Sequence, residues 1–303
     1  MSTIETDGAV AAYLADRKNE VERALETLVP PADAWPSTIH RAMRHSLFAG
    51  GKRLRPILCL AAAEALGGET SPALEPACGL EMIHTYSLIH DDLPALDDDS
   101  LRRGVPTCHV VFGEAIAILA GDALLTLGLG VLARYPKEEI YAAAKLQVLD
   151  TVIDAIGTGG MIGGQVADLE AEKDPSPTED LVRRIHETKT GRLFRASLAV
   201  GGILSFAERP ELERLDRFGR ALGVAFQIKD DLLDVESDPE TLGKAAGKDA
   251  AAGKATFPGV WGIDRSRRAL ADAIGEAVAE AEGLPGGGGR LPDLARFVGE
   301  RKS

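Results

Sequence analysis

Two clusters of aspartates are the part of the sequence best suited to chemistry. The first lies in the stretch IHDDLPALDDDSLRR and holds five carboxylates: Asp91, Asp92, Asp97, Asp98 and Asp99. Carboxylates this close repel one another, so we expect cations to hold them ionised together, and hard oxygen ligands of this kind suit magnesium. Arg102 and Arg103 follow, and their planar guanidinium groups match phosphate oxygens. The stretch therefore predicts metal and phosphate in one place.

A second acidic cluster lies far along the chain. In FQIKDDLLD, Asp230 and Asp234 share a helix face and Asp231 lies beside them. Two Asp-rich helices that face each other could clamp a diphosphate through bridging magnesium ions, because magnesium completes its coordination with water and substrate phosphate. The simpler alternative is that each cluster is a solvated helix end in an acidic protein.

The stretch GGKRLRP predicts an anion pocket. Lys52, Arg53 and Arg55 are crowded in front of Pro56, a residue favoured in the first turn of a helix. Free backbone N–H groups at a helix start, flexible glycines and three cations together suit a phosphate. By itself the stretch could equally be a solvated basic loop.

Four other polar residues lie where they could reach the same ligands. His84 precedes Asp91 by two helical turns, and it is either a phosphate ligand or a hydrogen-bonded core histidine. Lys189 and Thr190 stand just before a glycine inside a helical pattern, which often marks a kink or a close ligand approach. Gln227 lies one turn before Asp230.

A Gly-rich segment with spaced lysines follows the second cluster. Lys244, Lys248 and Lys254 lie in TLGKAAGKDAAAGKATFPG. A mobile basic loop beside an acidic metal site could close over a bound phosphate, and the alternative is an ordinary surface linker.

The elements that must position these residues are predicted to be helices. Ala and Leu are abundant, aromatic residues make up only 5%, and strand-like alternation is scarce, so we expect an all-α architecture. The pattern predicts helices over residues 5–28, 37–48, 56–66, 73–92, 115–133 and 138–156. The apolar stretch 115–133 approaches membrane-span length, but Asp122 and several glycines favour a buried core helix.

Charge and cysteine content exclude several classes of protein. The net charge of −13 argues against a nucleic-acid partner, which would require a basic face. Three cysteines without C-x-x-C spacing predict neither a disulfide framework nor a zinc site, so we expect a reduced cytoplasm. The acidic, polar first twenty residues do not read as an export signal.

The motifs together resemble the trans-isoprenyl diphosphate synthases, and among them the bacterial farnesyl diphosphate synthases. GGKRLRP, DDLPALD with its trailing RRG, TKTGRLF, FQIKDDLLD and GKATFPG stand in the order and approximate spacing of that family. The resemblance implies a single helical domain over residues 1–303 with a central cavity between helices, usually assembled as a homodimer. It also implies a prenyltransferase that uses magnesium, three ions in the family's manner, to join isopentenyl diphosphate to an allylic diphosphate.

The resemblance also assigns roles to individual residues. Magnesium would be bound by Asp91 and Asp97 from the first motif and Asp230 from the second, with support from Asp92, Asp231 and Asp234. Isopentenyl diphosphate would be held by Lys52, Arg55, His84 and Arg103. The allylic diphosphate would be held by Arg102, Lys189, Lys244 and Lys254. Thr190 and Gln227 would present dipoles to the allylic cation.

Product length is predicted from the residues just before the first motif. In the family, the residues four and five positions before the first aspartate help to form the floor of the chain pocket, and here they are Ser87 and Tyr86. With the inserted pair Pro94-Ala95, a bulky Tyr86 resembles synthases that stop at farnesyl diphosphate. An ideal helix turns Tyr86 away from the face of Asp91, so its pocket role rests on the resemblance, and a geranylgeranyl or geranyl product stays open.

Three other functions remain as alternatives. A terpene cyclase would also ionise diphosphates, but DDLLD and GGKRLRP argue against it. A non-catalytic subunit of a heteromeric synthase usually lacks one aspartate motif, and both are intact here. An acidic helical scaffold would neither bind nor turn over diphosphates.

Overall fold

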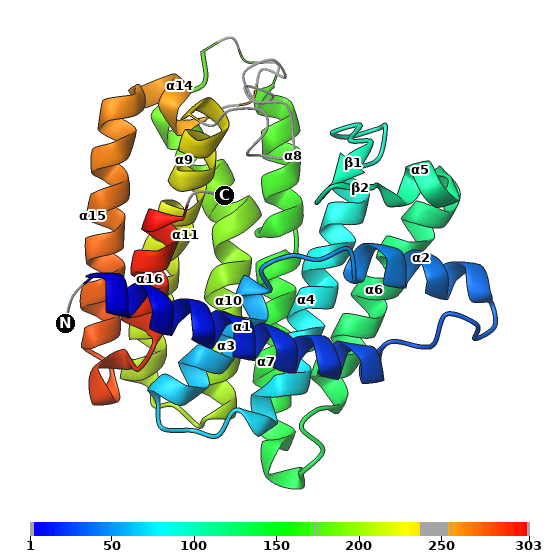
Figure 1. The fold of residues 1–303 in the computed structure, drawn as a ribbon, viewed down its shortest axis with the longest axis horizontal. Coiled ribbons are helices and arrows are strands. Elements are labelled where there is room, and N and C mark those ends of the chain that lie inside the picture. The colour runs from blue at the N-terminus through cyan, green and yellow to red at the C-terminus, as the bar shows by residue number, and fades with distance from the viewer. Residues whose placement is uncertain (1–2, 173, 175, 237–253, 255, 302–303) are drawn as a thin grey trace.

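Helices form nearly all of the regular structure in the described part of the chain. The computed structural model describes residues 3–172, 174, 176–236, 254 and 256–301, with side chains from residue 8 onward. Its long helices stand roughly side by side as a bundle (Figure 1). The predicted all-α architecture is confirmed.

Three helices form the centre of the bundle. They are α3 (Leu54–Ala65), α4 (Ser71–Asp91) and α10 (Arg192–Leu204). Every side chain from Ile57 to Ala63 is inaccessible to solvent, as expected for a helix that is apolar all round. Truncating one of these leucines to alanine should cost about 2–5 kcal/mol of stability. Helix α4, which leads into the first aspartate cluster, packs against this fully buried stretch of α3.

Helix α6 (Glu114–Arg134) packs along α4, and the prediction of a buried core helix holds for only one of its faces. The two helices touch where Gly79 meets Gly128: a Cβ on Gly128 would lie 2.8 Å from the Gly79 carbonyl oxygen. The opposite face exposes Ile118 and Leu119, because α6 lies at the edge of the bundle. Among the described helices, α6 alone has the length and hydropathy of a membrane span, which is weak evidence for one.

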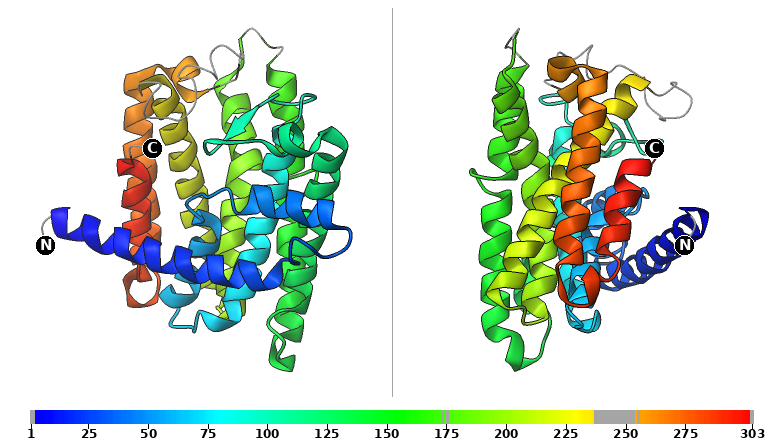
Figure 2. Two further views of the ribbon diagram at one scale, coloured as in Figure 1. Left: turned by 45° about the vertical axis from the view of Figure 1, so that its right-hand side comes forward. Right: turned by 90° about the vertical axis from the view of Figure 1, so that its left-hand side faces the viewer.

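The remaining helices surround this centre. Helix α1 crosses the long helices on one face, and the views in Figure 2 place it away from the layer of α6, α7 and α8. The bounds are α1 (Thr3–Leu28), α2 (Ser37–Leu47), α5 (Cys108–Phe112), α7 (Ala142–Ile156), α8 (Met161–Ala171), α9 (Glu179–His186), α11 (Arg209–Glu236), α14 (Phe257–Trp261), α15 (Ile263–Glu282) and α16 (Leu291–Glu300), with 3₁₀ turns at Glu139–Tyr141 and Pro285–Gly288.

A small hairpin that the sequence did not predict follows the first aspartate cluster. Strands β1 (Leu101–Arg102) and β2 (Val105–Pro106) are antiparallel, and Arg103 and Gly104 form the turn with φ of 54° and 79°. Positive φ at both turn residues is the geometry that matches the twist of two-residue hairpins. Two-residue strands leave no alternation to detect, yet this hairpin positions both predicted arginines.

The kink expected near Gly191 is present as a π-helical segment, η2 (Glu187–Gly191), between α9 and α10. Such segments occur frequently at functional sites. A Cβ on Gly164 of α8 would lie 2.4 Å from the backbone nitrogen of Lys189, so α8 approaches this segment closely. The π-helical segment therefore places Lys189 and Thr190 against α8.

Candidate active site

A cavity of about 340 Å³ lies between α4, α8 and the π-helical segment. Seven residues singled out from the sequence line it: Arg55, His84, Tyr86, Ser87, Asp91, Lys189 and Thr190. Apolar side chains such as Met161, Val166 and Leu169 complete the wall on α8. We call this space the central cavity, and it combines charged groups with apolar surface as an amphiphilic ligand requires.

Asp91, the last residue of α4, brings a carboxylate to the central cavity. Burial raises the pKa of Asp91 to about 6, and the negative charges of Asp97 and Asp92 add to the shift while Lys189 and Arg102 oppose it. The Asp97 backbone N–H donates to the Asp91 carbonyl at 2.9 Å, which curls the chain back after the helix. The carboxylates of the first cluster are thus crowded in a partly dry place, where a cation would favour their ionised form.

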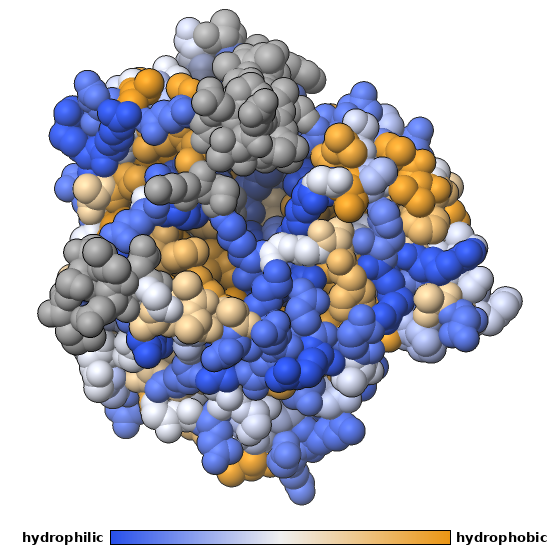
Figure 3. All heavy atoms as spheres, in the orientation of Figure 1, coloured by the Kyte–Doolittle hydropathy of each residue, from blue (hydrophilic) through white to orange (hydrophobic). Residues whose placement is uncertain are grey.

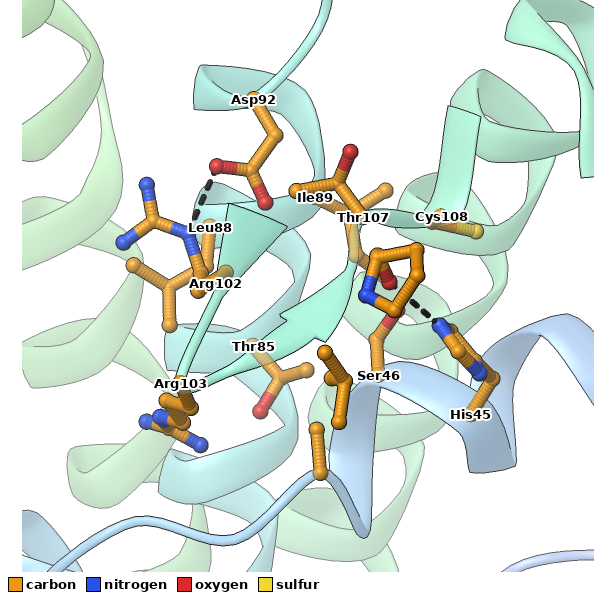
Figure 4. Close-up of a pocket in the computed structure, with 13 residues that line it drawn as sticks. His45, Ser46, Thr85, Leu88, Ile89, Asp92, Arg102, Arg103, Thr107 and Cys108 are labelled. Carbon is orange, nitrogen blue, oxygen red and sulfur yellow. Dashed lines mark hydrogen bonds and ion pairs between the residues drawn. The ribbon is translucent and has the colours of Figure 1, made fainter. Parts of the chain in front are cut away.

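The hairpin presents Arg102 to the first cluster (Figure 4). Its Nε donates to Asp92 Oδ1 at 2.6 Å, and Nη2 lies 3.6 Å from Asp99 Oδ2. The hairpin also contacts α2, where His45 Nε2 and the Pro106 carbonyl oxygen lie 2.8 Å apart. Asp92, predicted as a supporting metal ligand, is therefore nearly buried and paired with Arg102.

The second cluster lies near the carboxyl end of α11, and its three aspartates have different surroundings. Asp230 accepts from Arg301 Nη2 at 2.6 Å. Asp231 is only 2% exposed and accepts from Gln227 Nε2 at 2.8 Å and from the Phe257 backbone N–H at 2.9 Å. Asp234 is partly exposed. Asp231 thus ties α11 to the start of α14.

Two of the predicted cations for isopentenyl diphosphate, Arg55 and Arg103, lie near His84. Arg55 lines the central cavity, and burial lowers its pKa to about 10, an effect that Glu81 opposes. Arg103 donates to the Gly50 carbonyl oxygen, and a Cβ on Gly51 would lie 2.6 Å from its guanidinium carbon. The GGKRLRP loop and the hairpin are therefore in direct contact.

His84 itself is partly buried and lies among positive charges. Burial, followed by Arg55 and Arg103, lowers the pKa of its imidazole well below the ordinary value. The ring is therefore neutral near pH 7. A neutral imidazole can still donate one hydrogen bond to a diphosphate oxygen.

The predicted allylic cations lie among the carboxylates. Lys189 Nζ is 2.6 Å from Asp168 Oδ2 on α8, and Lys254 Nζ is 3.3 Å from Asp97 Oδ1. Thr190 donates from Oγ1 to Gln227 Oε1 at 3.2 Å, so the two predicted dipoles are neighbours. Lys244 lies outside the described residues.

Comparison with known proteins decides the family. Residues 36–284 match the family described as polyprenyl synthetase. The chain belongs to the polyprenyl synthetase family. As a polyprenyl synthetase it is a prenyltransferase, as the motifs predicted.

Individual relatives are similar over almost their full length. The chain is 44% identical to a geranylgeranyl diphosphate synthase of Cyanophora paradoxa over 280 residues, 92% of each chain. It is 43% identical to a farnesyl diphosphate synthase of Bacillus subtilis over 275 residues, 91% of this chain and 92% of that one. The solved geranylgeranyl pyrophosphate synthetase of Pyrococcus horikoshii Ot3 superposes with a TM-score of 0.87 at 33% identity, covering 96% and 98% of the two chains. This likeness confirms the helical fold of the family.

In this polyprenyl synthetase, Tyr86 lines the same cavity as Asp91, although helix geometry predicted that they face apart. The cavity is wide enough to take in both faces. The Tyr86 ring meets His90 edge to face, with centroids 5.7 Å apart, and its buried hydroxyl has no hydrogen-bond partner. Tyr86 therefore contributes to the wall of the central cavity.

A second cavity, of about 300 Å³, lies between α1, α11 and α16. Leu14, Phe226 and Phe297 contribute apolar wall, and Lys52 and Arg301 also line it. On this face of the molecule, Figure 3 shows hydrophobic atoms in a recess with hydrophilic borders. Lys52 is thus near Arg301. Burial, together with the positive charge of Arg301, lowers the pKa of Lys52.

Sequence reasoning missed several residues that lie at the site of this synthetase. The sequence assigned no role to Arg301, because nothing in its neighbourhood links it to a motif 71 residues earlier. It also assigned none to Asp168, the partner of Lys189. The spacing of Met161, Gln165 and Leu169 at every fourth residue could have indicated a common helix face.

The donor set fits magnesium in its chemistry. All predicted ligands are carboxylates, and in the first cluster burial, with a smaller contribution from the charge of Asp97, raises the pKa of Asp91. Among the described residues, no three His, Cys, Asp or Glu side chains form a ready-made metal group. Magnesium usually takes only one or two carboxylates and completes its shell with water and substrate phosphate, so such a group is not required.

Proposed function

We propose that this prenyltransferase condenses isopentenyl diphosphate head-to-tail with dimethylallyl or geranyl diphosphate to give (2E,6E)-farnesyl diphosphate and diphosphate. The observation that carries the proposal is the composition of the central cavity. Asp91, Lys189, Arg55 and His84 share one space with apolar wall from α8. Charged heads and an apolar chain can therefore be bound together.

Two separate sets of side chains would bind the two diphosphates. Arg102, Lys189 and Lys254, with Lys244 outside the described residues, would hold the allylic diphosphate against the aspartates. Lys52, Arg55, Arg103 and neutral His84 would hold isopentenyl diphosphate. Both substrates would then have their reacting carbons in the cavity, where positioning would replace a bimolecular encounter.

The chemistry requires no protein nucleophile. The allylic C–O bond breaks with its electron pair leaving on the diphosphate, and cationic side chains stabilise the charge that develops there. Magnesium held by Asp91, Asp97 and Asp230 would supply the remaining charge neutralisation. The isopentenyl double bond then attacks the allylic carbon, while the Thr190 hydroxyl and Gln227 amide turn dipoles toward the cation. Loss of a proton to the released diphosphate leaves the new double bond.

A fifteen-carbon product is the finer part of the proposal. It is supported by the Tyr86 ring in the cavity wall. Relatives of similar identity carry the names of farnesyl and of geranylgeranyl synthases, so a twenty-carbon product is the second candidate. A ten-carbon product is the third candidate, and the two intact aspartate motifs argue against a terpene cyclase.

We also propose a homodimer in the cytoplasm. Large exposed apolar side chains are concentrated on neighbouring helices: Val110, Val111, Ile118, Leu119, Leu146, Ile153, Ile162 and Val166 on α5 to α8. An apolar face of this extent is typical of an interface, and a second copy is the simplest occupant. The three cysteines are free and buried, which suits a reducing compartment. Sedimentation of the purified protein at micromolar concentration would test the dimer, and a monomer would contradict it.

The test of the function is a product assay. Purified protein is incubated with magnesium, labelled isopentenyl diphosphate and, in separate reactions, dimethylallyl, geranyl or farnesyl diphosphate, and the dephosphorylated products are separated by chain length. We expect fifteen carbons from the first two primers and little extension of the third. A twenty-carbon product would support prenyl transfer but contradict the proposed fifteen-carbon product. A cyclic hydrocarbon released without isopentenyl diphosphate would indicate a cyclase.

A further inference from the structure

Arg53 lies between two predicted diphosphate ligands, Lys52 and Arg55, but its guanidinium is buried elsewhere. Its side chain is 0% exposed. Nε donates to Glu22 Oε1 at 2.8 Å and Nη1 donates to Glu81 Oε1 at 2.7 Å. Nη2 donates to the Leu47 carbonyl oxygen at 2.6 Å. The sequence grouped Arg53 with the anion-binding cations, whereas the structure engages it fully with α1, α2 and α4.

The backbone at Arg53 turns sharply into α3. Arg53 has a φ of 51°, in the left-handed region, and it stands as the N-cap of the helix. A residue with a Cβ pays about 1–2 kcal/mol for this conformation. Gly50 and Gly51 before it also have positive φ, of 96° and 122°. The three contacts of the Arg53 guanidinium therefore hold a loop that its own backbone does not favour.

This loop determines where the neighbouring cations lie. Lys52 directly precedes the turn, and Arg55 is the second residue of the helix that it starts. The Ile57 N–H donates to the Arg53 carbonyl oxygen at 3.1 Å, which ties the turn to the first helical hydrogen bonds. A shift of Arg53 would move both cations together.

Glu81 connects the same loop to α4 and to its charges. It is 1% exposed and lies one turn before His84 on α4. Its negative charge is the largest influence opposing the effect of burial on the pKa of Arg55 and of Arg103. Glu81 thus anchors Arg53 and also counterbalances the buried cations around the pocket.

We propose that Arg53 and Glu81 are a positioning pair for the isopentenyl diphosphate pocket, which fixes Lys52 and Arg55 relative to His84 without touching substrate. The proposal rests on the proposed function, since it assigns these cations to that substrate. The pair acts on one of the two diphosphates, because the allylic ligands Arg102 and Lys189 are held by Asp92 and Asp168 instead.

The test compares Arg53→Met, Arg53→Lys and Glu81→Gln with a matched control, Arg17→Met. Arg17 also joins α1 to the core through a partly buried carboxylate, Glu64, but lies outside the loop. Initial rates give kcat and KM for each substrate, and calorimetry gives the Kd of isopentenyl diphosphate alone. Circular dichroism checks that each variant is folded.

For Arg53→Met we expect KM and Kd for isopentenyl diphosphate to rise about tenfold or more, with KM for the allylic primer within about twofold. Arg53→Lys should restore part of the loss, and Arg17→Met should change neither KM. An equal rise in KM for both substrates, or an unchanged KM for isopentenyl diphosphate, would contradict the positioning role of Arg53 and Glu81. If Arg53→Met does not fold, the comparison of Arg53→Lys and Glu81→Gln with wild type decides by the same criterion. A folded wild type without condensation would instead reject the proposed function.

Discussion

Arg301 donates from Nη2 to Asp230 Oδ1 at 2.6 Å, joining the last described residue to the first carboxylate of the second cluster. The same nitrogen donates to the Phe226 carbonyl oxygen at 3.0 Å, and the guanidinium lies 4.0 Å from the centre of the Phe226 ring. These contacts fix the end of α16 on α11. They also place a cation in the wall of the second cavity.

Arg301→Met should therefore weaken both stability and turnover. Because the Asp230 side chain is 42% exposed, solvent screens this pair, and its loss should cost at most about 1 kcal/mol of unfolding free energy; we expect kcat/KM for condensation to fall about tenfold or more. Urea unfolding and initial rates measure the two effects. Arg296→Met is the control, because Arg296 lies on the same helix but pairs with Glu282 and Asp293 at the surface. Equal effects of the two substitutions would refute a special role for Arg301.

Tyr86 offers two substitutions with opposite expectations. Tyr86→Ala removes a ring from the wall of the central cavity, so the product should lengthen to twenty carbons or more. Tyr86→Phe keeps the ring and removes a buried hydroxyl without a partner. Since an unpaired buried polar group costs about 1–3 kcal/mol, Tyr86→Phe should leave stability unchanged or raise it, with the product length unaltered. An alanine variant that makes the wild-type product would show that Tyr86 is not the stop.

His84 should make stability depend on pH in a defined direction. Its folded pKa lies below the unfolded value of about 6.5, so the unfolded chain binds more protons below that pH. Stability should therefore be full above about pH 7 and fall as the pH drops, by up to about 1.4 kcal/mol per unit from this residue. His84→Asn should lose this dependence, and urea unfolding of both proteins between pH 5 and 8 measures the difference. Parallel curves would mean that His84 titrates normally.

The helical architecture and most of the site could be predicted from the sequence, because both depend on local patterns. Apolar stretches gave the helix α4 and its approach to Asp91, and the two aspartate motifs are each contiguous. Thr178, a residue type favoured at helix starts, caps α9 and accepts from the Leu181 N–H.

The rest depends on tertiary contacts that no local pattern records. Arg53 looks like its neighbours Lys52 and Arg55 in sequence, and only the carboxylates of two other helices turn it inward. Asp231 resembles Asp230, but the Phe257 N–H accounts for one of its oxygens. Arg301 reaches Asp230 only because α16 packs beside α11.

The central claim is that the two aspartate clusters act together to ionise an allylic diphosphate. The most direct measurement is the magnesium-dependent rate of condensation in Asp91→Asn and Asp230→Asn, with Asp98→Asn as the matched control. Asp98 belongs to the same run but is exposed, and asparagine tolerates its φ of 48°. We predict that each of the first two loses about a thousandfold or more in kcat, while the control stays within about threefold of wild type. Wild-type rates in Asp91→Asn or Asp230→Asn would contradict the claim.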